Sequence, residues 1–412
     1  MRPVTRYSGV ADLPLHNGHV PPYLFERMRV LGGLIARYIV EYYGPGELVR
    51  RLGDPFWFQA FNNVIGMDWD SSGSTTVVVY VLKNTFPPGS LRDNGIAVLG
   101  GKGRDSRAVA EEAKAISDVA DYERIVGASR MAAKIDGVAL QDGYSIYIHS
   151  LIVDSDGDML VVQQGLNEDS GMARRYHLPV PKGSLPTTRV EPHSGVASMK
   201  IELSLNLANP GSREARRAIL DIVSSTPPGS LLNSLGEANR ILRGEPSILS
   251  WVTGGAQGDT WSRVRQLTEV CPRYYRPVAN LRLVGKAASE IKKLGVREFD
   301  ELIGLPGVGA ETIRALALVA DLIYGYRPSL RDPTTSIMDP FLYAYAHGGK
   351  DGVPYPVRVE HIDRTIEFFA SMLDEVKVGA RDREHMLRRL ASFADRVKRA
   401  IGFLEGSSDY IP

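Results

Sequence analysis

The stretch from Gly100 to His193 concentrates the polar side chains whose types and spacing could do chemistry. It mixes lysine, arginine, aspartate, glutamine and histidine near the ends of expected helices and strands. Basic groups there could hold a phosphate and stabilise the charge of its transition state, while a carboxylate or an imidazole could move a proton or bind a metal ion. The candidate catalytic residues of this stretch are Lys134, Asp136, Asp142, His149 and Gln164.

The chemistry of this cluster is open in two respects. No HxH, HExxH or paired-carboxylate spacing identifies a metal site, so Mg²⁺ or Mn²⁺ is an alternative and not an expectation. His149 could equally be a core histidine whose hydrogen bonds are satisfied within the fold. Taken together, the residues favour a functional pocket for phosphodiester chemistry.

A glycine-rich loop precedes the cluster, between an expected strand at 96–99 and an expected helix at 108–116. Glycines let backbone N–H groups approach an anion closely. The loop is not a Walker A motif, because Gly-Lys is not followed by Ser or Thr, and a structural turn is the alternative. Further along, a pair of arginines could contact phosphate or simply form a solvated face. The phosphate-binding candidates here are Gly101, Lys102, Gly103, Arg104, Arg174 and Arg175.

A second anion site is expected at Leu305–Thr312, Leu-Pro-Gly-Val-Gly-Ala-Glu-Thr, between expected helices at 299–303 and 313–323. Its glycines let the backbone approach a phosphate, and the following helix points unpaired N–H groups and a positive dipole end at the same anion. The arrangement resembles the helix-hairpin-helix of DNA-repair proteins; a plain tight turn is the alternative. The residues expected to take part are Gly307, Gly309 and Thr312.

A polar, glycine-rich loop at 346–357 is the third candidate. Its glycines would let the backbone approach a partner, and its charged groups would supply donors, whereas the alternative is a solvent loop. The phosphate-binding candidates in it are His347, Gly348, Gly349 and Lys350.

The bulk composition is typical of a globular protein, and its basic segments in the C-terminal half favour nucleic-acid binding there. The chain has 412 residues, 43% hydrophobic and 24% charged, and a net charge of +1. Bases outnumber acids nine to two between Arg263 and Arg297 and eight to three between Lys377 and Arg399, as phosphate neutralisation requires. The single cysteine, Cys271, fits a reducing cytosol, and no apolar run is long enough for a membrane span.

The periodicity of apolar residues predicts two domains. Residues 1–209 mix helices with strands, including a buried strand at 75–82 and a hairpin of strands at 144–153 and 159–163. We expect an α/β (α+β) domain with a polar, anion-binding pocket there. Residues 210–412 are helical by the same criterion, so we expect an all-α helix-hairpin-helix domain that binds nucleic acid.

Short motifs along the whole chain resemble one protein family. They are Leu13–His16, Asp54–Gln59, Gly100–Gly103, Val162–Gly165, Ala173–His177, Glu191–His193 and Ala346–Gly352. The family is named domain of unknown function 763, with members mainly in archaea and thermophilic bacteria. The resemblance implies a cytoplasmic protein of a thermophile, and it brings no reaction with it.

The C-terminal half is similar, more loosely, to the helix-hairpin-helix glycosylases, which place a catalytic aspartate after the hairpin. Asp332 fits that spacing best, whereas Asp339 matches the motif of the unknown-function family. Glu311 stands where bifunctional glycosylases carry the lysine of their lyase step, and a glutamate cannot form a Schiff base. The resemblance therefore implies monofunctional hydrolysis through Asp332 or Asp339.

A nucleic-acid-processing enzyme of DNA repair accounts for both halves. The leading hypothesis is nuclease-type chemistry in the N-terminal pocket, with the hairpin holding the phosphate backbone without sequence preference. The alternatives are a glycosylase that flips a base into a pocket beside the hairpin and a non-catalytic DNA-binding or scaffold protein. DNA is the expected partner; the sequence leaves RNA, the metal requirement and the oligomeric state open.

Overall fold

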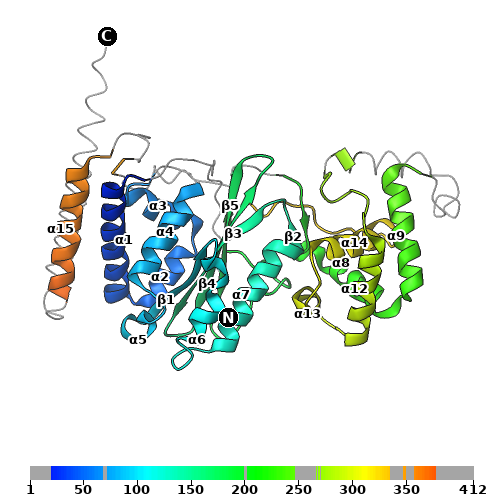
Figure 1. Cartoon of the computed structure of the whole chain (residues 1–412), viewed down its shortest axis with the longest axis horizontal. Helices are drawn as coiled ribbons and strands as arrows, with labels where there is room; N and C mark the ends of the chain where they lie inside the picture. The colour runs from blue at the N-terminus through cyan, green and yellow to red at the C-terminus, as the bar shows by residue number, and fades with distance from the viewer. Residues whose placement is uncertain are drawn as a thin grey trace, which may run out of the picture.

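Apolar side chains on alternate positions give a central antiparallel sheet two buried faces, each covered by helices (Figure 1). The computed structural model describes residues 20–67, 72–198, 202–245, 271–334, 347–348 and 357–376, with residues 266, 268 and 269. The sheet has the order β1-β3-β4-β5-β6, and β2 pairs with β7 beside it. The strands are β1 (Ile96–Lys102), β2 (Leu140–Gln141), β3 (Ser145–Asp154), β4 (Met159–Asn167), β5 (Met172–Val180), β6 (Gly195–Ala197) and β7 (Leu205–Asn206).

The N-terminal helices cover one face of this sheet. Ile152 and Leu160 on that face share a buried cluster with residues of these helices, such as Met28 and Phe58. The helices are α1 (Pro22–Tyr43), α2 (Pro45–Leu52), α3 (Pro55–Val64) and α4 (Ser72–Thr85). The short helix α5 (Ser90–Asn94) leads from α4 into β1.

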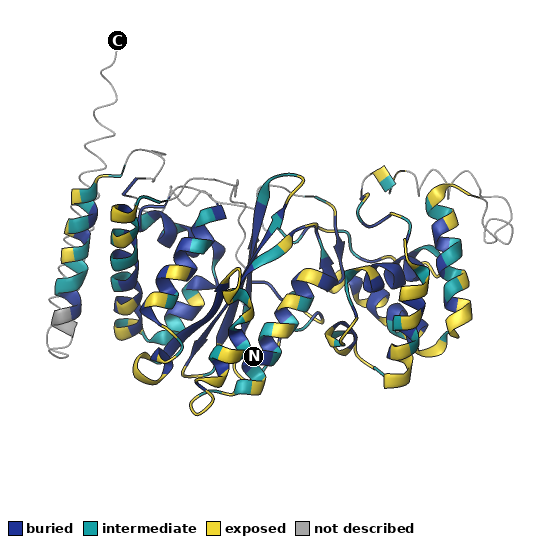
Figure 2. Cartoon of the chain, viewed as in Figure 1, coloured by how far each residue is buried: buried dark blue, intermediate teal, exposed yellow. Residues whose placement is uncertain are grey.

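The opposite face packs on α6 (Val109–Lys114) and α7 (Tyr122–Lys134). Leu151 and Val161 from that face belong to one continuous cluster with Ile219 and Leu316 of the C-terminal helices. Those helices are α8 (Arg213–Ser225), α9 (Pro228–Arg243), α12 (Leu281–Leu294), α13 (Phe299–Gly304) and α14 (Ala310–Leu322). Short helical turns are η1 (Asp105–Arg107), η2 (Ile135–Ala139) and η3 (Pro210–Ser212). Figure 2 shows the buried sheet and the buried inner faces of the surrounding helices.

The last described helix, α15 (Val359–Val376), packs against α1 at the far end of the molecule from α9 (Figure 1). Arg27 Nε lies 2.8 Å from Asp363 Oδ1, and Ile362 belongs to the buried cluster of the N-terminal helices. The predicted order of a mixed region followed by a helical one is confirmed. The division at residue 209 stays a prediction; a core cluster crosses it, and α15 contacts the N-terminal part.

The strand predicted at 75–82 is wrong, because these residues form most of α4. Its β-branched residues favour a strand locally. Val77, Val78 and Val81 instead recur at helical spacing and are all buried, so tertiary packing overrides that preference. None of the described helices is long and apolar enough to cross a bilayer.

Gly100 provides a test of the packing of β1 on β3. It has φ +76°, and an added Cβ would lie 2.3 Å from the carbonyl oxygen of His149 and 2.9 Å from Val109 Cγ2. We predict that Gly100→Ala lowers the free energy of unfolding by roughly 3 kcal/mol or more, because strain and overlap add. Gly103→Ala, with φ +63° and nothing within 4 Å of the new Cβ, should cost only about 1–2 kcal/mol. Urea titration of both variants would contradict this explanation if their losses were equal.

Candidate functional site

A chain of buried polar side chains crosses the α7 face of the sheet. α7 ends in the π-helical turn η2, a distortion often found at functional sites, and Asp136 of this turn is 1% exposed. His193 Nε2 lies 2.6 Å from Asp136 Oδ1, and Gln163 Nε2 donates to the other carboxylate oxygen. Glu191 Oε1 lies 3.2 Å from the second ring nitrogen of His193. Asp136 therefore joins the loop before β6 to the middle of β4.

The chain continues from Gln163 across β3 to α7. Gln163 Oε1 lies 2.9 Å from His149 Nδ1, as expected for residues paired in the β3–β4 register. His149 Nε2 lies 2.7 Å from the hydroxyl of Ser129. Two candidates from the sequence, Asp136 and His149, are thus brought together through a glutamine.

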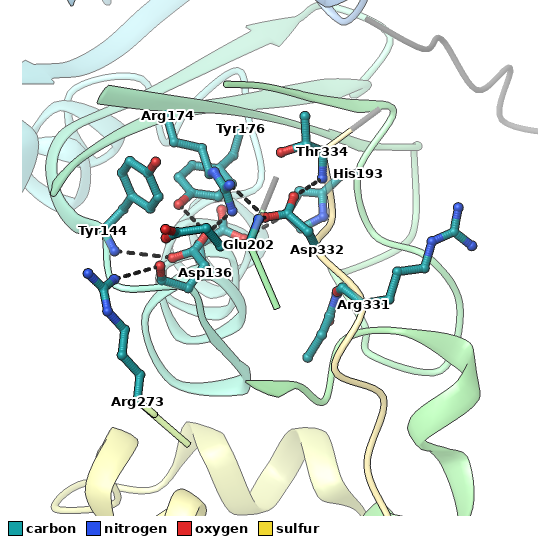
Figure 3. Close-up of polar contacts among 12 residues, drawn as sticks. Asp136, Tyr144, Arg174, Tyr176, His193, Glu202, Arg273, Arg331, Asp332 and Thr334 are labelled. Atoms are coloured by element: carbon teal, nitrogen blue, oxygen red, sulfur yellow. Dashed lines mark hydrogen bonds and ion pairs between the residues drawn. The ribbon is translucent and has the colours of Figure 1, made fainter. Parts of the chain in front are cut away.

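A second group centres on Arg174 of β5, whose guanidinium is 1% exposed (Figure 3). Its Nη1 lies 2.8 Å from Asp142 Oδ2, and its Nη2 lies 2.8 Å from Asp332 Oδ2. The hydroxyl of Tyr176 donates to Asp142 Oδ2 at 2.8 Å, and the guanidinium lies over the ring of Tyr144. Arg174 therefore carries a structural ion-pair network and is not exposed to a phosphate.

Asp332, the glycosylase-type candidate, is held at every oxygen. Besides the ion pair to Arg174, its Oδ2 accepts from the N–H of Glu202 at 2.9 Å, and its Oδ1 accepts from the N–H of Thr334 at 2.7 Å. It is 6% exposed. Asp332 is therefore a buried, paired carboxylate, and Asp142 on the other side of Arg174 is held in the same way. The other aspartate of that hypothesis, Asp339, lies outside the described residues.

Burial and pairing set the ionisation of the network. Burial alone would lower the pKa of His193, but the Asp136 carboxylate outweighs it and raises that pKa to about 10. Burial lowers the pKa of His149, whose partner Gln163 carries no charge. The ring of His193 is accordingly cationic at neutral pH, while the ring of His149 is neutral.

The segment that carries Asp136 and Asp142 is tied at both ends to the α13–α14 hairpin. Lys134 Nζ donates to the carbonyl of Val308 at 2.7 Å, and burial lowers the pKa of this lysine. Gln141 Nε2 donates to the carbonyl of Ala310 at 2.8 Å. Lys134, a predicted catalytic residue, thus positions the hairpin loop. The structure places the two regions expected from the sequence side by side.

The hairpin loop presents backbone to solvent. Gly307 is exposed with φ +79°, and an added Cβ at Gly307 or Gly309 would meet nothing within 4 Å. Thr312 is buried behind them, in the first turn of α14. Glu311 pairs with Arg276 and Arg314. The loop tip is therefore open to a ligand at its two glycines.

The glycine-rich loop at the end of β1 is already bonded within the protein. The N–H of Gly100 donates to Glu112 at 2.6 Å, and the N–H of Gly103 donates to the carbonyl of Tyr147 at 3.1 Å. Lys102 and Gly101 line a pocket of about 510 Å³. Arg104 is exposed. The pocket is lined by residues of α4 such as Tyr80 and Lys83, while the backbone of Gly101 pairs with that of His149 in the β1–β3 register.

Gln164 and Arg175 lie on the opposite face of the sheet from Asp136, because consecutive strand residues point to opposite faces. Both are fully buried. Gln164 bonds Thr75 and the carbonyl of Ser72, and the Arg175 guanidinium lies over the ring of Phe58. Neither side chain reaches solvent, which does not fit the predicted catalytic role of Gln164 or the predicted phosphate contact of Arg175.

His347 is 2% exposed and bridges two helices. Its Nδ1 lies 2.6 Å from the carbonyl oxygen of Val64, and its Nε2 lies 3.0 Å from Thr365 Oγ1. Both ring nitrogens are thus used within the fold, which corrects the expected phosphate contact. The neighbouring Gly348 is buried. Gly349, Lys350 and the basic segment at 377–399 lie outside the described residues.

Four members of the network were not among the site residues selected from the sequence: Ser129, Gln163, Glu191 and His193. Alternation along β4 would have placed Gln163, and not Gln164, on the face of His149. His193 has no periodic signal, because it lies in the loop before β6. No group of three or more metal-binding side chains is found in the part of the chain that the structure describes.

The pair of Asp136 and His193 predicts a pH dependence of stability. A pKa raised from 6.5 in the unfolded chain to about 10 in the folded one adds stability that is fully present below pH 6.5 and is lost as the pH rises towards 10. Every tenfold tightening of proton binding on folding contributes about 1.4 kcal/mol. Urea titrations from pH 6 to 10 should therefore show a loss of stability in wild type and a smaller loss in His193→Gln. Parallel pH profiles for the two proteins would refute the ion pair.

The comparisons with known proteins fit the motifs along the chain. A family model described as "Protein of unknown function (DUF763)" matches residues 9–357, which include every strand and the hairpin of α13 and α14. No curated protein and no solved structure matches the chain. The expected family is confirmed by the length of the match. The chain belongs to the DUF763 family of proteins of unknown function.

Proposed function

We propose that this protein processes nucleic acid, holding the phosphate backbone at the α13–α14 hairpin and doing phosphodiester chemistry beside it. The observation that carries the proposal is the double tether between Lys134–Asp142 and the hairpin loop. A strand bound at Gly307 and Gly309 would lie next to the segment that supplies Asp136 and Asp142. The binding loop and the acid–base groups would then be connected through one segment of chain.

The backbone-binding half of the proposal rests on the loop geometry. The glycines are open, and the first N–H groups of the 13-residue helix α14 have no carbonyl one turn earlier within the helix. Such donors, with the helix dipole, favour a phosphate. Arg273 and Arg276 belong to the basic segment before the hairpin, and Arg276 pairs with Glu311 at the start of α14. Contacts of this kind are blind to base sequence.

A non-catalytic nucleic-acid-binding protein is the second candidate. Asp136, Asp142 and His193 are each at most 5% exposed. Buried charges that are fully paired often serve structure, and a scaffold would need only the hairpin. The same binding surface therefore serves both candidates, and turnover separates them.

Gly309 allows a clean test of backbone binding. Its φ of −119° suits any residue, and a Cβ meets nothing within 4 Å. We predict that Gly309→Leu leaves the fold intact but weakens binding of single-stranded and duplex DNA about tenfold, or roughly 1.4 kcal/mol. The loss of affinity should be equal for DNA of unrelated sequences. Binding of single-stranded RNA, measured in parallel, shows whether the protein prefers DNA or RNA. Gly229→Leu, at an equally open glycine of α9, is the matched control. Unchanged binding by Gly309→Leu would remove the hairpin from the interface.

Chemistry is tested by incubating the protein with labelled single-stranded, duplex, uracil-, hypoxanthine- and 8-oxoguanine-containing DNA. The reactions are run with Mg²⁺, with Mn²⁺ and with EDTA, and read before and after alkali. We predict direct cleavage that Asp142→Asn reduces at least tenfold while DNA binding stays within about twofold. Breaks seen only after alkali would indicate base excision instead. Binding without any product would favour the scaffold.

A further inference from the structure

Ser129, His149 and Gln163 form a hydrogen-bonded line whose proton positions follow from chemistry. Gln163 Nε2 donates to Asp136 and lies 3.3 Å from the carbonyl of Ala132, two groups that only accept. The amide oxygen of Gln163 must therefore face His149, and an amide oxygen only accepts. Consequently His149 Nδ1 carries the hydrogen, and its Nε2 is the free acceptor that meets the Ser129 hydroxyl at 2.7 Å.

This is the order of groups that activates a nucleophile: a hydroxyl, a base and a third group that orients the base. Burial, which lowers the pKa of His149, keeps the ring neutral and able to take a proton. The line runs from core to surface: Gln163 and His149 are buried, whereas Ser129 is partly exposed and Arg130 beside it is exposed. The reactive end is thus the end that a substrate can reach.

We propose that Ser129 is a nucleophile, with His149 as its general base and Gln163 as the residue that positions His149. The inference rests on the proposed function in one respect, that the electrophile is the phosphorus of a nucleic-acid phosphodiester. Neither motif reasoning nor the hairpin hypothesis assigns a role to Ser129.

The step balances without a further reactant. Ser129 Oγ forms a bond to phosphorus while its proton passes to His149 Nε2. The bond from phosphorus to one strand oxygen breaks, and the imidazolium returns the proton to that oxygen. One strand end stays joined to Ser129 as a phosphodiester, which water or the released hydroxyl then cleaves. Arg130 follows Ser129 in α7 and is exposed, and Gly101 pairs with His149 in the β1–β3 register.

A fluorophosphonate tests the hydroxyl directly, because Ser129 Oγ would displace fluoride and His149 would take the proton. Peptide mass mapping of the intact chain should find the phosphonyl group on Ser129. We predict no modification there in Ser129→Ala and at least tenfold slower modification in His149→Gln. Ser117→Ala is the matched control, since Ser117 is an exposed serine bonded only to the carbonyl of Lys114 among the described contacts.

If the fluorophosphonate is too large to reach Ser129, cysteine variants at Ser129 and Ser117 provide a second test with a smaller reagent. In Ser129→Cys the base should generate a thiolate, so iodoacetamide at pH 7 should alkylate it at least tenfold faster than the thiol of Ser117→Cys. Peptide mapping separates both from the buried native Cys271. No modification of Ser129 together with equal alkylation of the two thiols would overturn the inference.

The positioning role of Gln163 has its own readout. Gln163→Leu removes the acceptor for His149 Nδ1–H and should slow modification at least tenfold. Gln163→Glu should restore it, because a protonated carboxyl beside Asp136 can donate to Asp136 and still accept from His149. Loss in both variants, with folding intact by circular dichroism, would count against positioning.

A labelled oligonucleotide joined covalently to wild type on a denaturing gel, and absent in Ser129→Ala, would identify the electrophile. Fluorophosphonate and thiol reactivity need no nucleic acid. Reactive Ser129 in a protein that binds no oligonucleotide would therefore overturn the proposed function alone. Oligonucleotide binding with an inert Ser129 would overturn only the nucleophile.

Discussion

The paired charge of Arg174 is the interaction on which the rest of the site depends. One buried guanidinium holds Asp142, which follows β2, and Asp332, which follows α14, at 2.8 Å each. Removing one partner from such a buried group typically costs about 3–5 kcal/mol, because the remaining charge has no water. An arrangement that separated Arg174 from either aspartate would pay this cost. The two ion pairs therefore hold β5, the η2–β2 segment and the chain after α14 together.

The network and the hairpin loop are both bonded to one segment of chain, so a change in one can be transmitted to the other through that segment. Residues 134–142 contribute carboxylates inward and bonds to the hairpin outward. A ligand that pulls on the loop acts on the same backbone that places Asp136. Ser129 lies on the preceding helix, less than two turns from Lys134. The proposed anchoring, acid–base and nucleophilic groups would therefore all be carried by α7 and the segment that follows it.

Sequence reasoning recovers most of the described helices and the β3–β4 hairpin, because long periodic segments show the spacing of their buried residues. It fails at β5, where Arg174 and Arg175 replace the expected apolar residues. Buried arginines cannot be told from a solvated face in the sequence alone. Arg174 is compensated by Asp142 and Asp332, both far from it in the chain, whereas Arg175 hydrogen-bonds His177 and Gln59. The prediction of a strand at 75–82 fails because the β-branched residues of α4 are buried at helical spacing. Alternation along β4 could have identified Gln163, whereas the contacts of Ser129 in α7 and of His193 in the loop before β6 arise only in the tertiary fold.

The contact between α15 and α1 has a consequence for how the chain is made. Chains emerge from the ribosome N-terminus first and tend to fold in that order. The cluster around Met28 includes Ile362, and Arg27 pairs with Asp363, so the α1 face stays uncovered during most of translation. Closing so long a loop adds entropy cost and slows folding. The part of the protein that is synthesised first therefore completes its core last.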